Sequence, residues 1–97
     1  MTLSEFRRTL TRTNPPSGLA PALAALWWAA KDDWERAHDL VMNEESGDCA
    51  WVHAHLHRVE GNLGNARYWY RQAGKPVTTV ALQSEWDALA AALLAKA

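Results

Sequence analysis

Residues spaced 29 positions apart along this chain share physical roles, and this internal repeat limits the possible fold more than any other feature. Ala25 aligns with Ala54, and Asp33 aligns with Asn62. Small residues such as Ala let two helices approach closely, and Asp or Asn is a preferred helix N-cap. The other aligned pairs are Trp34 with Leu63, Ala37 with Ala66, Leu40 with Trp69 and Val41 with Tyr70. Because a single helical hairpin cannot bury its apolar face, the repeat predicts two stacked hairpins.

Apolar periodicity and turn residues predict helices over residues 3–11, 19–30, 34–44, 49–60, 63–73 and 79–95. We expect Ser17 and Asp48 to cap the helices at 19–30 and 49–60. The predicted fold class is therefore all-α. We divide the chain into a basic, partly helical N-terminal arm, residues 1–18, and a single helical-repeat domain, residues 19–97. The arm is expected either to pack on this domain or to dock on a partner.

The last predicted helix is apolar almost all round, since no charged residue occurs from Ala88 to Ala95. A helix with one face in water does not have this pattern. We expect it to cap the hairpin stack, and the segment Trp86–Ala95 is also a candidate homodimer contact.

Composition excludes several classes of protein. The net charge of −1, from 10 Lys and Arg against 11 Asp and Glu, argues against general nucleic-acid binding. One Cys excludes a disulfide framework and a Cys-rich zinc module. No apolar run is long enough to span a bilayer, and the polar residues after Arg7 and Arg8 do not fit a twin-arginine signal. We therefore expect a cytoplasmic protein without membrane contact.

Two family resemblances follow from the second repeat. The pattern of Ala54, then Gly61 to Ala66, Tyr70 and Ala73 resembles the tetratricopeptide signature, and residues 69–73 are similar to the end of a Sel1-like repeat. The segments Trp51–Ala54, Leu56–Arg58 and Tyr68–Tyr70 also resemble a family of short bacterial proteins of unassigned function. The first hairpin departs from the repeat signature, because Asp32 stands where Gly is usual and Glu44 where Ala is usual. These resemblances imply two tetratricopeptide-like hairpins.

The helix predicted at 49–60 carries the residues that could bind a metal. Cys49, His53 and His57 follow one another at intervals of one helical turn, and Glu60 lies three residues further on. Two imidazoles one turn apart can chelate a divalent ion, with a thiolate or carboxylate as third ligand. The alternative is that His53 and His57 are hydrogen-bonded packing residues. We expect His55 to point away from this face into solvent.

Enzymatic function has little support in the sequence. The nucleophile elbow, Walker A and dinucleotide-binding motifs are absent, as is the H-E-x-x-H zinc motif. Cys49 with His53 could form a thiolate–imidazole pair, but a single Cys beside Trp51 is more commonly inert.

The leading functional hypothesis is a non-enzymatic module that binds a protein or peptide in a groove between the helices at 19–30 and 49–60. Aromatic and charged side chains would anchor such a partner. The alternative is a metal- or small-molecule-binding protein centred on His53 and His57. We assign no cofactor. The candidate binding residues are His53, His57, Arg67, Tyr68, Arg71 and Trp28.

Overall fold

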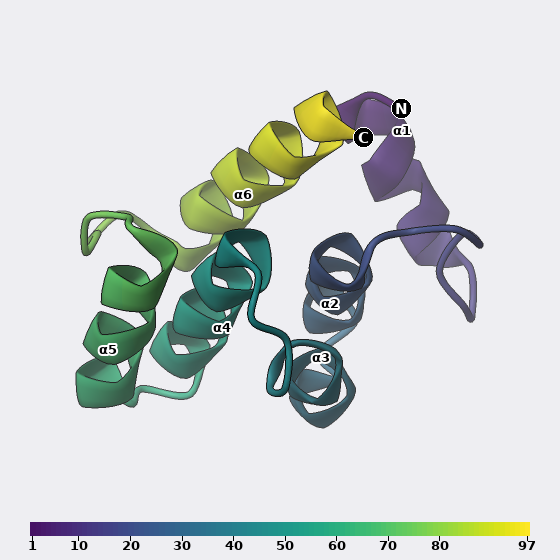
Figure 1. The fold of residues 1–97 in the computed structure, drawn as a ribbon. Helices are drawn as coiled ribbons and strands as arrows, with labels where there is room; N and C mark the ends of the chain where they lie inside the picture. The colour runs from purple at the N-terminus through teal and green to yellow at the C-terminus, as the bar shows by residue number, and fades with distance from the viewer.

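The computed structural model describes residues 1–97 and consists of helices without any strand, so the all-α prediction is confirmed (Figure 1). Its elements are α1 (Leu3–Arg8), a 3-10 turn (Thr9–Thr11), α2 (Pro21–Ala30), α3 (Trp34–Val41), α4 (Gly47–Val59), α5 (Leu63–Ala73) and α6 (Leu82–Lys96). None of these helices combines the length and apolar character that crossing a membrane requires.

The helices α2 and α3 form one hairpin and α4 and α5 form a second, and their turns match in detail. The predicted caps are confirmed, because the side chains of Asp33 and Asn62 each accept a hydrogen bond from the backbone three residues later. The preceding residues, Asp32 and Gly61, both have positive φ, at 60° and 83°. The backbone bonds closing the turns run from Asp33 to the Trp28 carbonyl at 3.0 Å and from Asn62 to the His57 carbonyl at 2.8 Å. The 29-residue repeat therefore extends to the backbone of the turns.

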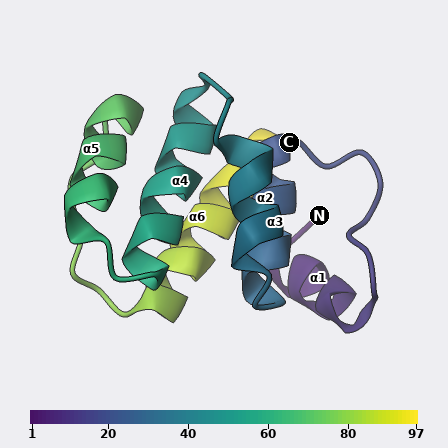
Figure 2. The ribbon, with the colours of Figure 1, turned by 90° about the horizontal axis from the view of Figure 1, so that it is seen from below.

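Helix α6 crosses the stack and covers α2 and α4, as Figures 1 and 2 both show. Leu89 and Leu93 are buried against the hairpins, and the indole N–H of Trp86 donates to the Leu26 carbonyl at 2.8 Å. The predicted capping role of the last helix is confirmed. Helix α6 lies along the expected groove between residues 19–30 and 49–60 and contacts both helices, so what stays open there is a pocket at the end that Ala29 and Val59 line.

The N-terminal arm packs on the domain. Phe6 is fully buried, and its ring stacks on Trp86 with centroids 5.9 Å apart. The indole N–H of Trp27 donates to the hydroxyl of Thr9 at 3.0 Å. The arm thus forms part of the core that the tryptophans build.

Three predicted helix starts differ from the structure. Helix α4 begins at Gly47 and is capped by Ser46, not Asp48. Helix α2 begins at Pro21, and its N-cap residue is Ala20, so no side chain caps it. The prediction that Ser17 caps this helix is therefore wrong. Helix α6 begins only at Leu82. The first residue of a helix depends in part on tertiary packing, which local sequence patterns do not show.

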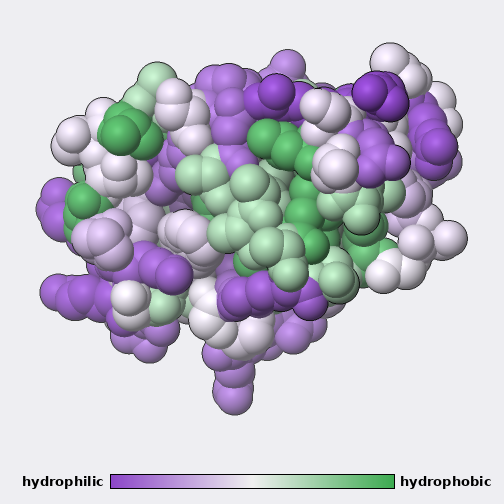
Figure 3. Space-filling model, turned by 90° about the horizontal axis from the view of Figure 1, so that it is seen from above, coloured by the Kyte–Doolittle hydropathy of each residue, from purple (hydrophilic) through white to green (hydrophobic).

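The outer side of α6 remains apolar. Ala88, Ala91 and Ala95 are exposed there, and Figure 3 shows pale and deep green atoms gathered across this side of the molecule. Self-association through Trp86–Ala95 stays a prediction.

Candidate metal centre

Three histidines from two hairpins converge beside α4. His38 lies on α3, whereas His53 and His57 lie one turn apart on α4. One ring nitrogen from each lies within 4.8 Å of the others, and the Nε2 atoms of His38 and His53 are 3.0 Å apart. We call these three residues the histidine cluster.

Two tryptophans hold the imidazoles of the histidine cluster in place. Trp69 stacks on His53 with centroids 4.0 Å apart and an interplanar angle of 15°. Trp34 stacks on His38 at 4.6 Å and 11°, and its own indole N–H donates to the Leu56 carbonyl at 2.7 Å. The aromatic walls fix the ring planes and exclude water from one side of each ring.

Glu60 orients the third ring. Its Oε1 lies 2.8 Å from Nδ1 of His57. A carboxylate can only accept, so the neutral ring carries its proton on Nδ1 and presents the lone pair of Nε2 to the cluster. Metal-binding histidines in proteins almost always donate their other ring N–H to a carboxylate, a backbone carbonyl or water.

His53 is the most constrained member of the histidine cluster. It is only 3% exposed, and its Nδ1 is buried without any hydrogen-bond partner. Burial, together with the neighbouring His38 and His57, lowers the pKa of His53 to about 4. Burial and His57 also lower the pKa of His38. Both rings are therefore neutral at pH 7, the state in which imidazole binds a metal.

This pKa shift predicts a loss of stability in acid. Because the folded pKa of about 4 lies below the ordinary 6.5, the unfolded chain binds more protons as the pH falls through this interval. We expect the free energy of unfolding to decrease by up to about 3 kcal/mol from pH 7 to pH 4 through His53. Urea unfolding across this pH range measures it. His53→Phe keeps the stacking but cannot titrate, so its curve should be flatter; parallel curves would contradict the assignment.

Cys49 is not a member of the histidine cluster. It is buried among core residues, and burial raises the pKa of its thiol, which disfavours the thiolate that a metal requires. The third nitrogen comes instead from His38. Sequence reasoning did not select this residue, since the repeat aligns it with Arg67 and only the packing of α3 on α4 brings it to the cluster.

The expectation that His55 points into solvent is wrong. It is 2% exposed, because α6 covers this side of α4, and its Nδ1 lies 2.7 Å from Oε1 of Glu85. Arg58 donates to the same oxygen at 2.7 Å, and the Tyr70 hydroxyl donates to the other. Burial raises the pKa of Glu85, but these donors outweigh it and leave that pKa below its ordinary value. We call these four residues the Glu85 network.

The other candidate binding residues are divided between α5, which carries Arg67, Tyr68 and Arg71, and α2, which carries Trp28. Tyr68 is 45% exposed and contacts Trp69 edge to face at 5.1 Å, which places it next to the histidine cluster. Arg71 is exposed on α5, and Arg67 lines a small pocket beside Tyr70. Trp28 lies on α2, half-buried, with the guanidinium of Arg36 4.2 Å from its ring centre. The structure therefore does not unite them in one groove.

Comparison of the chain with models of known families, with curated proteins and with solved structures gave no match. The resemblances to tetratricopeptide and Sel1-like repeats stay predictions.

Proposed function

We propose that this protein binds one transition-metal ion, of which zinc is the first candidate, through His38, His53 and His57. The observation that supports this most is the convergence of one ring nitrogen from each histidine within 4.8 Å of the others, with the Nε2 atoms of His38 and His53 3.0 Å apart. Neutral imidazoles suit zinc, copper, nickel and iron.

The position of the ligands suggests what the ion would do for the fold. His38 belongs to the first hairpin, and His53 and His57 belong to the second. A bound ion would therefore link the two hairpins and stabilise their stacking. Three protein ligands are one fewer than a closed structural zinc site has, so a position would remain for water or an exchangeable ligand.

A zinc titration of the purified, metal-stripped protein tests the proposal. We expect one ion per chain and an increase of the melting temperature with zinc concentration, because an ion that binds only the folded state stabilises it. The variant Cys49→Ser should behave like the natural chain. Absence of binding, or an equal response to zinc after replacement of both His53 and His57 by alanine, would contradict the proposal.

A protein-binding role remains a second candidate, at a different surface from the expected groove. Met42 and Tyr68 are large, exposed apolar residues beside a surface pocket of about 450 Å³ that Trp69 and Gln72 also line. Aromatic residues of this kind are common anchors in interfaces. A pull-down with Tyr68→Ala as the comparison tests this role independently of metal.

A further inference from the structure

A small pocket lies between α5, the end of α4 and the segment 77–79 that leads into α6. Its volume is about 160 Å³, which is below the range of pockets for drug-sized ligands, so only a small molecule fits. The lining combines apolar side chains with hydrogen-bond donors, among them Leu63, Ala66, Val77, Arg58, Arg67 and Thr78. We call this cavity the α5 pocket.

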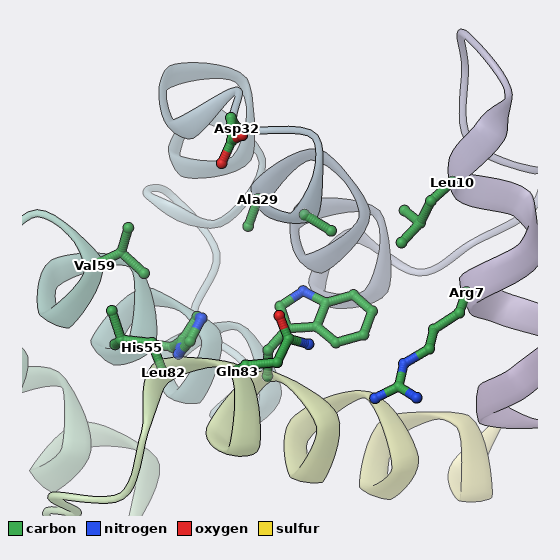
Figure 4. A pocket seen from close by; sticks show the side chains of 10 residues that line it. Arg7, Leu10, Ala29, Asp32, His55, Val59, Leu82 and Gln83 are labelled. Carbon is green, nitrogen blue, oxygen red and sulfur yellow. The ribbon is translucent and has the colours of Figure 1, made fainter.

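The α5 pocket differs from the other surface pockets in its charge. Two arginines line it, and no carboxylate does. Each of the other four pockets has a carboxylate in its lining; the cavity in Figure 4, for example, is lined by Asp32 as well as by Arg7. Because the charged groups that line the α5 pocket are all positive, this pocket favours an anion.

The backbone of Val80 fixes two of the donors at the same wall of the α5 pocket. Its carbonyl accepts from Nη2 of Arg58 at 2.6 Å, and its N–H donates to the Thr78 hydroxyl at 3.3 Å. The Thr78 oxygen is the acceptor in this bond, so the hydroxyl can still donate its own proton. The guanidinium of Arg58 likewise has further N–H groups beyond the two that bond to Val80 and Glu85.

Arg67 supplies a positive charge that no carboxylate of the protein balances. Arg58 is ion-paired with Glu85, and the other arginines with a carboxylate partner are Arg7 and Arg36. The side chain of Arg67 is exposed, so its guanidinium can contact a ligand at the mouth of the pocket without breaking an ion pair. Once Glu85 is counted against Arg58, the α5 pocket retains one positive charge.

We infer that the α5 pocket binds a small aliphatic carboxylate of about the size of butyrate. The carboxylate group would accept from Arg58, Arg67 and the Thr78 hydroxyl, and guanidinium groups match carboxylates in shape. The alkyl chain would cover Leu63 and Val77, which are 56% and 54% exposed. One uncompensated positive charge favours a monoanion over inorganic phosphate. This inference is independent of the proposed metal site.

Nuclear magnetic resonance titration with butyrate at pH 7 tests this inference, with 1-butanol as the uncharged match and inorganic phosphate as a third probe. We expect butyrate to shift the backbone amides of Leu63, Thr78 and Thr79. Its affinity should exceed that of butanol at least about tenfold, because hydrogen bonds to a charged group distinguish the two. Acetate, which lacks two methylene groups, should bind roughly tenfold more weakly than butyrate.

Two variants on α5 show whether the binding belongs to the α5 pocket. Arg67→Gln should remove most of the preference for butyrate over butanol. Arg71→Gln should leave it, because this residue lies one turn further along α5, exposed and outside the lining. Both side chains are exposed and without an ion pair, so neither variant should change the urea midpoint appreciably.

Three results would overturn the inference. The first is equal affinity for butyrate and butanol, and the second is tighter binding of inorganic phosphate than of butyrate. The third is an equal effect of Arg67→Gln and Arg71→Gln, which would show attraction to a basic surface instead of binding in the α5 pocket.

Discussion

Replacing Glu85 by alanine is expected to lower the free energy of unfolding by about 3–5 kcal/mol. Glu85 is 4% exposed and accepts from His55, Arg58 and Tyr70. Alanine would leave the buried phenol of Tyr70 and the buried imidazole of His55 without this acceptor, and Arg58 would keep only the Val80 carbonyl. It would also remove the polar contacts that link α6 to α4 and α5.

Urea denaturation at pH 7 measures this effect. Glu85→Gln keeps the shape and one acceptor, so it should cost less than alanine. Gln83→Ala, on the exposed face two residues earlier, should change stability by no more than about 0.5 kcal/mol. If Glu85→Ala costs as little as Gln83→Ala, the Glu85 network does not hold α6 on the hairpins.

Replacing His38 by alanine is expected to weaken zinc binding at least about a hundredfold. Loss of a residue that only orients a ligand already costs 10- to 100-fold in other metal sites, and His38 would supply a ligand atom itself. Its side chain is only half-buried, so the variant should fold. Competition with a chromophoric chelator gives the affinity.

Two further variants make this result specific. Glu60→Gln should weaken zinc binding less than His38→Ala, because the amide oxygen can still accept from His57. Cys49→Ser should leave the affinity unchanged, since the thiol lies in the core. The opposite order, with Cys49→Ser weakening binding and His38→Ala neutral, would show that the sequence-based ligand set was right and the histidine cluster irrelevant.

The sequence predicted the parts of the fold that depend on local chemistry. Asp33 and Asn62 are of the residue types that are preferred at helix N-caps, and both cap a helix in the structure. The small residues at helix contacts could be recognised in the same way, from residue type alone. The apolar tail of the chain predicted a cap over the hairpins. It did not show that this helix would lie along the groove in which we expected a peptide to bind. The pattern of apolar residues within each helix does not show which helices pack together.

The candidate site could be predicted only in part for a similar reason. His53 and His57 share a face of one helix, so their spacing alone brings them together. His38 joins them through the packing of one hairpin on the next, and His55 is buried by a contact with Glu85 thirty residues away. Periodicity within one helix carries no information about either contact.

The central claim, that histidines of both hairpins hold one metal ion, is tested most directly by a crystal structure of the zinc-loaded protein with anomalous scattering at the zinc edge. We predict a single anomalous peak within about 2.0–2.1 Å of one nitrogen each of His38, His53 and His57. A crystal grown in excess zinc in which Nε2 of His38 still contacts Nε2 of His53 directly, with no peak between the three rings, would contradict it.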